Sequence, residues 1–222
     1  MTSPLEGLEP TLLWRHFDTI RRIPRPSKHE ERVRAAVAAW AAERGFTTTV
    51  DPTGNLVVKV PGHAGHEAAP TVVLQGHLDM VCEKNSNVDH DFMNRGIEVE
   101  VAGGWVQAKG TTLGADNGIG VAAAMAVADD PQLVHGPLEL LFTIDEETGL
   151  TGAKELDASM LSGRLMLNLD TEEDGSVYIG CAGGADSIGR LATPRRTGLL
   201  GSVPAKLAVR GLRGGHSGLN II

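Results

Sequence analysis

The chain of 222 residues is poor in aromatic side chains, in cysteine and in long apolar stretches. Aromatic residues make up 4% of it, and its two cysteines are Cys82 and Cys181. Because these lie far apart and in no metal-binding spacing, we expect free thiols in a reducing compartment. No window approaches the roughly 18 consecutive apolar residues of a membrane span. The first residues also lack the pattern of a signal peptide, so we expect a cytoplasmic protein.

An excess of positive charge is missing as well. The formal net charge is −8, and the basic residues form no run. Surfaces that bind nucleic acid or anionic membranes are rich in Lys and Arg, so neither partner is expected. With 41% hydrophobic and 22% charged residues, the chain can bury a sizeable core. Part of the negative charge is available as ligands for cations.

Hydrophobic periodicity predicts helices and strands that alternate along the chain. Amphipathic helices are expected near residues 11–23 and 31–44, and the spacing of Ser27 and Glu30 predicts a capping box at the start of the second helix. Strands are expected at residues 46–50, 56–60, 71–75, 97–101, 105–108, 138–143 and 165–169. The first two form one hairpin and the fourth and fifth another, whereas the third, sixth and seventh are expected to be buried. This order predicts an α/β sandwich with a mainly parallel central sheet and antiparallel edges.

A glycine-rich loop at residues 110–120 presents Asp116 just before an apolar helix that runs to about residue 128. Glycines let the backbone of such a loop turn tightly against its surroundings. Taken alone, Asp116 has two interpretations. It could be an N-cap, which predicts a hydrogen bond from its side chain to an amide two or three residues on. It could instead be a ligand, and the strand ends favour that reading.

Acidic and imidazole side chains follow each of the three predicted buried strands. In open α/β sheets these strand ends are where ligands bind. These strand ends and the glycine-rich loop together contain six candidate side chains: His77, Asp79, Asp116, Glu146, Glu147 and Asp170. Their nitrogen and oxygen atoms are donors that zinc accepts, and a carboxylate can bridge two ions. The sequence therefore predicts a metal centre at this edge of the sheet.

The spacing within two of these motifs predicts different roles for neighbouring residues. Strand alternation turns His77 and Asp79 to the same side, so Asp79 can hold one ring N–H and leave the other nitrogen for a metal. Glu146 and Glu147 would repel each other if left bare, so we expect one to be a ligand and the other a general base.

The motifs resemble those of the M20 metallopeptidases, and within them most closely those of the aminoacyl-histidine dipeptidases. They are Gly-His-Leu-Asp at 76–79, Gly-Ala-Asp-Asn-Gly at 114–118, Asp-Glu-Glu-Thr-Gly at 145–149, Leu-Asp at 169–170 and Gly-Gly-His-Ser-Gly at 214–218. The likeness also includes residues 24–30 and 180–184, so it covers nearly the whole chain.

The resemblance implies a centre of two zinc ions, with Co²⁺ or Mn²⁺ as alternatives that the same donors would accept. His77 and Asp170 would hold one ion and Glu147 the other, with Asp116 bridging them. The resemblance also implies a cis peptide bond after Asp116. A further histidine for the second ion comes, in the family, from near the end of a much longer chain, and nothing here replaces it.

The resemblance also implies a reaction, the hydrolysis of dipeptides of the Xaa-His type with broad specificity. Asp79 would orient His77, Glu146 would take a proton from the attacking water, and His216 would help to hold the oxyanion. No Gly-x-Ser-x-Gly elbow is present, which argues against a serine nucleophile. Two alternatives stay open: an M20 deacylase or carboxypeptidase, and a truncated metal-binding fragment without turnover.

The domain organisation follows from the same resemblance. Residues 1–185 would form a catalytic domain that lacks its last strands, and residues 186–222 the start of an α+β lid and dimerisation domain. A full-length chain would be a homodimer with dipeptide substrates.

Overall fold

The computed structural model describes residues 3–171, 173, 175–180, 188–193, 198, 201 and 203–209. The chain divides into two units, Met1–Asp174 and Gly175–Ile222. All the helices and strands found in the described residues belong to the first unit. The predicted boundary between a catalytic domain and a lid at residue 185 stays a prediction.

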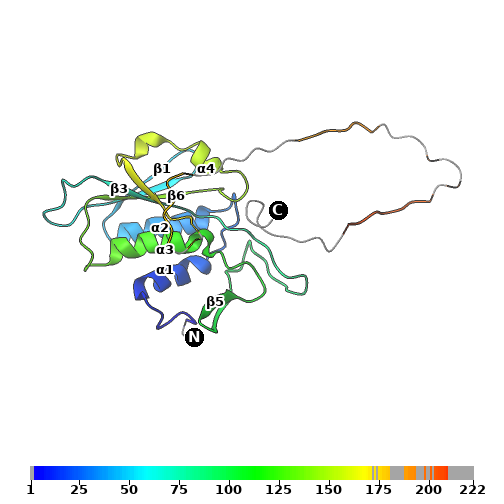
Figure 1. The fold of residues 1–222 in the computed structure, drawn as a ribbon, viewed down its shortest axis with the longest axis horizontal. Helices are drawn as coiled ribbons and strands as arrows, with labels where there is room; N and C mark the ends of the chain where they lie inside the picture. Colours follow the sequence, from blue (N-terminus) through cyan, green and yellow to red (C-terminus); the bar gives the residue numbers. More distant parts are fainter. Residues whose placement is uncertain are drawn as a thin grey trace. The chain divides into compact units, whose positions relative to one another are not determined.

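A five-stranded sheet forms the centre of the first unit (Figure 1). Its strands lie in the order β1 (Thr47–Val50), β2 (Leu56–Val60), β6 (Leu138–Thr143), β3 (Val72–His77) and β7 (Leu165–Asn168). Strand β3 runs parallel to both β6 and β7, whereas β1 and β2 are antiparallel. The predicted mainly parallel sheet with an antiparallel edge is therefore confirmed. Because β6, β3 and β7 are parallel neighbours, their carboxyl ends meet at one edge.

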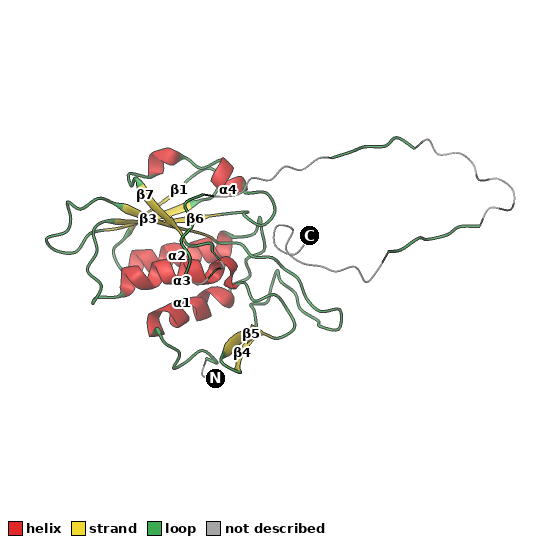
Figure 2. Ribbon diagram, viewed as in Figure 1, coloured by secondary structure: helices red, strands yellow, loops and turns green. Residues whose placement is uncertain are grey.

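Helices cover both faces of this sheet (Figure 2). Helices α2 (Glu31–Glu43) and α3 (Ala115–Asp129) pack on one face, and α1 (Thr11–Arg21) packs against α3. The short helix α4 (Thr151–Lys154) and a 3₁₀ turn at Ala158–Met160 lie on the other side. The predicted sandwich is confirmed, and both predicted N-terminal helices are present.

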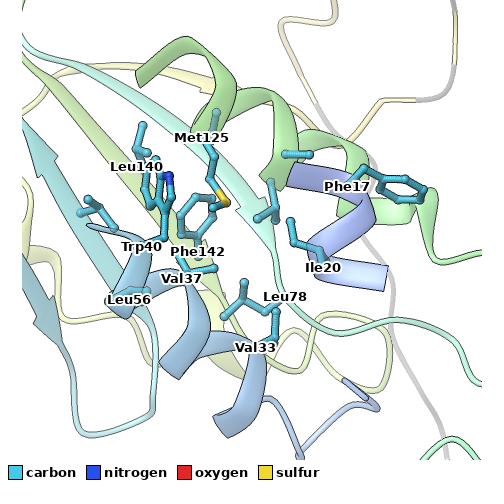
Figure 3. Close-up of a cluster of buried hydrophobic side chains, with 14 of the residues drawn as sticks. Phe17, Ile20, Val33, Val37, Trp40, Leu56, Leu78, Met125, Leu140 and Phe142 are labelled. Carbon is cyan, nitrogen blue, oxygen red and sulfur yellow. The ribbon is translucent and has the colours of Figure 1, made fainter. Parts of the chain in front are cut away.

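Side chains of β6 divide the core into two parts, as strand alternation requires. Leu140 and Phe142 join the larger cluster, where they meet Trp40 of α2 and Met125 of α3 (Figure 3). Leu141 points to the opposite face and joins a smaller cluster beneath the 3₁₀ turn. Burial of these apolar side chains on both faces explains why β6 lies in the middle of the sheet.

Strand β7 differs from its prediction as a buried strand. Leu165, Met166 and Leu167 are 59%, 50% and 56% exposed. The strand is the last of the sheet, and within the described residues it pairs with β3 alone. The prediction was wrong because an apolar run indicates a strand but does not show whether another element covers it.

The predicted capping box is also wrong. Helix α2 begins at Glu31, and its N-cap residue Glu30 makes no capping hydrogen bond through its side chain. The Ser27 hydroxyl donates instead to the carboxylate of Asp79, and the carboxylate of Glu30 accepts from the amide of Asp145. Contacts distant in the sequence have taken both side chains.

A separate hairpin leads towards the glycine-rich loop. It consists of β4 (Val99–Ala102) and β5 (Trp105–Ala108), which pair antiparallel as predicted. In the described part of the chain, no helix is both long enough and apolar enough to cross a membrane.

Candidate metal centre

The side chains predicted from the strand ends converge at the carboxyl edge of the sheet. Donor atoms of His77, Asp116 and Asp170 all lie within 4.8 Å of one another, and so do donor atoms of His77, Glu146 and Glu147. His77 is the last residue of β3, and the other side chains belong to the start of α3 and to the segments after β6 and β7. The predicted convergence of His77, Asp116 and Asp170 is confirmed.

The imidazole of His77 is buried and is held from both sides. Its Nε2 lies 2.9 Å from Oδ1 of Asp116 and 3.8 Å from Oδ2 of Asp170. Its Nδ1 lies 3.1 Å from the main-chain carbonyl oxygen of Asp79 and 3.3 Å from Oδ1 of the same residue. Asp79 therefore contacts one ring nitrogen while the other faces the remaining acids, which is the arrangement expected of an oriented ligand.

Asp79 is fully buried, yet its carboxylate has many donors around it. It accepts hydrogen bonds from the amides of Glu146 and Glu147 at 3.0 and 3.1 Å, and from the Ser27 hydroxyl at 2.7 Å. Burial alone would raise its pKa, but the contact with His77 and these donors outweigh burial and lower the pKa to about 2. Asp79 is therefore a stable negative charge behind the ring.

Two acids on the other side of the ring, Glu147 and Asp170, have pKa values shifted in the opposite direction. Burial, and next the charge of Asp116, raise the pKa of Glu147 to about 7 and that of Asp170 to about 6. Burial would lower the pKa of His77, but the carboxylates of Asp116 and Asp79 outweigh it and raise that pKa to about 10. The pKa of Asp116 is lowered instead, first by its hydrogen bond with His77, so the ring supplies the positive charge among these acids. A divalent cation would supply that charge, so the donor set fits a metal.

Asp116 is not a helix cap. The N-cap of α3 is Gly114 in the left-handed region, and no side chain makes a capping hydrogen bond there. The backbone of Asp116 is not helical, and the peptide bond between Asp116 and Asn117 is cis, as predicted. The side chain is about half exposed and contacts His77. Its N-cap interpretation is therefore wrong.

Asn117 is a site residue that the sequence reasoning missed. Its Nδ2 donates to the carbonyl of Leu169 at 2.9 Å and to Oδ1 of Asp170 at 3.1 Å. The carboxamide fits between Gly76 and Gly120, since a Cβ at either glycine would collide with it. The signal was present in the two glycines, but only the fold brings them to the same side chain.

His216 lies outside the described residues, as does Cys181. The predicted role of His216 in holding an oxyanion therefore stays a prediction. So do the individual roles assigned to Asp79, Glu146 and the four ligands.

Comparison with known proteins agrees with the geometry of the centre. Residues 73–189 match the family model described as Peptidase family M20/M25/M40. The chain belongs to this family. The matched segment contains all six side chains of the metal centre.

Two dipeptidases are similar to the chain in sequence or structure, and a third protein shares its fold. The chain is 47% identical over 216 residues to the cytosol non-specific dipeptidase of Escherichia coli, covering 97% of this chain and 44% of that one. Its structure matches that of aminoacylhistidine dipeptidase from Vibrio alginolyticus with a TM-score of 0.78 and 51% identity, covering 81% of this chain and 36% of that one. Aminopeptidase PepT from Bacillus cereus shares the fold at 23% identity and a TM-score of 0.62, covering 73% of this chain and 43% of that one. The chain thus spans less than half the length of each.

Proposed function

We propose that this chain carries the metal-binding part of a dipeptidase of broad specificity that accepts Xaa-His dipeptides. The convergence of five donor side chains at one sheet edge carries the proposal. The names of the two similar dipeptidases support the substrate class. In the same reading the whole protein is a cytoplasmic homodimer.

The proposal assigns the ligands as follows. His77 and Asp170 would hold one Zn²⁺ and Glu147 the other, with the carboxylate of Asp116 available to both; Co²⁺ or Mn²⁺ would suit the same donors. When bound, such ions polarise the substrate carbonyl and lower the pKa of water. A further ligand for the second ion would come from outside this chain's described residues.

Glu146 is the proposed general base. Its carboxylate is half-buried, and burial followed by the charge of Asp116 raises its pKa, which makes it a better proton acceptor. It would accept a proton from the attacking water and pass it to the leaving amine. Asp79 keeps the imidazole of His77 in place throughout.

The substrate class is tested by offering the purified chain, supplied with Zn²⁺, three types of substrate. These are a dipeptide ending in histidine, the same dipeptide acetylated at its amine, and a longer peptide with the same last residue. We expect hydrolysis of the free dipeptide, measured as released histidine, and its loss after chelation of the metal.

Each alternative has its own outcome in this experiment. Release of acetate from the acetylated dipeptide would indicate a deacylase, and release of histidine from the longer peptide a carboxypeptidase. Metal binding without hydrolysis of any of the three would support a fragment without turnover.

A further inference from the structure

The segment between α1 and α2 contacts the loops that carry the side chains of the candidate metal centre. We call residues 25–30, Arg-Pro-Ser-Lys-His-Glu, the brace. Pro26 forms a parallel bridge with Met80, so the brace runs alongside the chain that leaves β3. Arg25 and Glu30 are 1% and 2% exposed. Two buried charged side chains within six residues require partners, and those partners show what the brace does.

Arg25 connects two of the loops that carry metal ligands. Its Nη1 donates to the carbonyls of Leu78 and Asp79 at 2.9 and 2.8 Å, and its Nη2 donates to the carbonyl of Gly114. A Cβ at Gly114 or Gly118 would lie 2.5 or 2.7 Å from Nη2, so both glycines leave room for the guanidinium. Arg25 thereby links the segment after His77 to the loop that presents Asp116.

Ser27 contacts the segment after His77, as Arg25 does, and Glu30 contacts a third segment, the one after β6. The Ser27 hydroxyl donates to Oδ2 of Asp79 at 2.7 Å, which leaves Oδ1 next to the ring of His77. Oε1 of Glu30 accepts from the amide of Asp145 at 2.9 Å, one residue before the two glutamates. The brace therefore contacts the segments after β3 and β6 and the loop before α3.

We propose that the brace is a positioning element of the metal centre, in which Ser27 sets the orientation of Asp79 and through it the ring of His77. Arg25 and Glu30 hold the neighbouring loops in register with that ring. The inference rests on the proposed function, since it assumes that these loops hold a metal. In this proposal Arg25, Ser27 and Glu30 neither bind the metal nor touch the substrate.

A matched pair of serine variants tests this role in the 222-residue chain. Ser27→Ala removes the hydroxyl that donates to Asp79. Ser162→Ala removes a hydroxyl that donates to Glu139 at 2.8 Å, so it is a control with an equivalent bond away from the metal centre. Binding of Co²⁺ is followed by calorimetry and by the visible absorption of the bound ion, which reports its coordination geometry.

We expect Ser27→Ala to bind Co²⁺ about 10-fold more weakly, with an altered absorption spectrum, because loss of a partner behind a ligand has effects of this size. Ser162→Ala should bind like the unchanged chain. Equal affinity and equal spectra for both variants would overturn the role of Ser27.

Hydrogen exchange without metal separates this inference from the proposed function. The amides of Glu146 and Glu147 donate to Asp79. Ser27→Ala should speed exchange at these two amides relative to the amides of β6, whereas Ser162→Ala should not. A uniform change at all amides would indicate general destabilisation and reject a positioning role. Absence of Co²⁺ binding by the unchanged chain would count against the proposed function, whatever the exchange shows.

Discussion

Acidic side chains at the two ends of the parallel strands have pKa values shifted in opposite directions. At the amino end of β6, Glu139 is 2% exposed, and its carboxylate accepts from the amide and hydroxyl of Ser162 and from the amide of Gly163. Burial would raise its pKa, but these donors outweigh burial and lower it. At the carboxyl end, the pKa values of Glu147 and Asp170 are raised.

Desolvation would raise the pKa at both ends, so it does not explain the difference. The difference lies in the neighbours: Glu139 accepts hydrogen bonds from Ser162 and Gly163, whereas the charge of Asp116 lies close to both Glu147 and Asp170. A carboxylate with its own donors is stable without a cation, whereas carboxylates that lie close to one another are stabilised by a bound cation. The contrast therefore favours the carboxyl end, where the donor atoms converge, as the place where a cation would bind.

The largest effect should come from His77→Ala, because this ring contributes to both groups of converging donors. We expect the affinity for Zn²⁺ to fall by more than about 100-fold, beyond the loss seen when only a ligand's partner is removed. Titration calorimetry measures it. His63→Ala is the control, since His63 lies with His135 ahead of β6 at the other end of the sheet. An equal loss of Zn²⁺ affinity in both variants would show that the two ends of the sheet do not differ in metal binding.

The next prediction separates the two adjacent glutamates. Glu146→Gln should keep metal and lower kcat for dipeptide hydrolysis by about 100-fold or more, the usual scale for loss of a general base. Glu147→Gln should weaken metal binding instead. Steady-state kinetics and metal analysis of the two variants distinguish them. A Glu146→Gln protein with near-normal kcat would remove Glu146 from the reaction.

A smaller effect is expected from Gly76→Ala in β3. The added methyl group would collide with Oδ1 of Asn117, whose Nδ2 holds Asp170. Displacement of that side chain should weaken Zn²⁺ binding by about 10-fold, the scale of losing a partner behind a ligand. Gly189→Ala is a suitable control because nothing lies within 4 Å of its added Cβ. Unchanged affinity in Gly76→Ala would show that Asn117 does not position Asp170.

The smallest effect concerns the stability of the metal-free chain. Glu139→Gln should lower the free energy of unfolding by about 1 kcal/mol at pH 7, the scale of one net hydrogen bond. Because the folded-state pKa of Glu139 is below its ordinary value, its contribution is present above about pH 4.5 and is lost as pH falls through the folded-state pKa. Urea unfolding from pH 7 to pH 3 should show the two proteins converging. A constant difference at every pH would contradict this account.

Local pattern was enough to predict most of the sheet. The bounds of β6 were predicted as found, and the turn at Asp51–Asn55 predicted the β1–β2 hairpin because Pro and Gly are typical of turns. Most side chains of the candidate metal centre could be predicted because they follow apolar strands directly, and Asp116 because a glycine-rich loop presents it before an apolar helix. The cis bond after Asp116 came from the resemblance and not from the pattern.

What could not be predicted depends on contacts between distant segments. Ser27 and Glu30 have the spacing of a capping box. In the fold, however, the Ser27 hydroxyl donates to Asp79 and the Glu30 carboxylate accepts from the amide of Asp145. Arg25 appears in the sequence as an ordinary charged residue, and only the fold shows that carbonyls from two loops surround it. Asn117 likewise acquires its role from Gly76 and Gly120, which are distant from each other in the chain.

The exposed edge strand β7 has a consequence for handling the protein. Within the described residues no further strand pairs with its outer edge, which presents backbone N–H and C=O groups beside the apolar side chains of Leu165, Met166 and Leu167. Such an edge is a template for pairing with a strand of another molecule. Self-association of the 222-residue chain should therefore increase with concentration, and a lysine in place of Met166 should reduce it without touching the ligands.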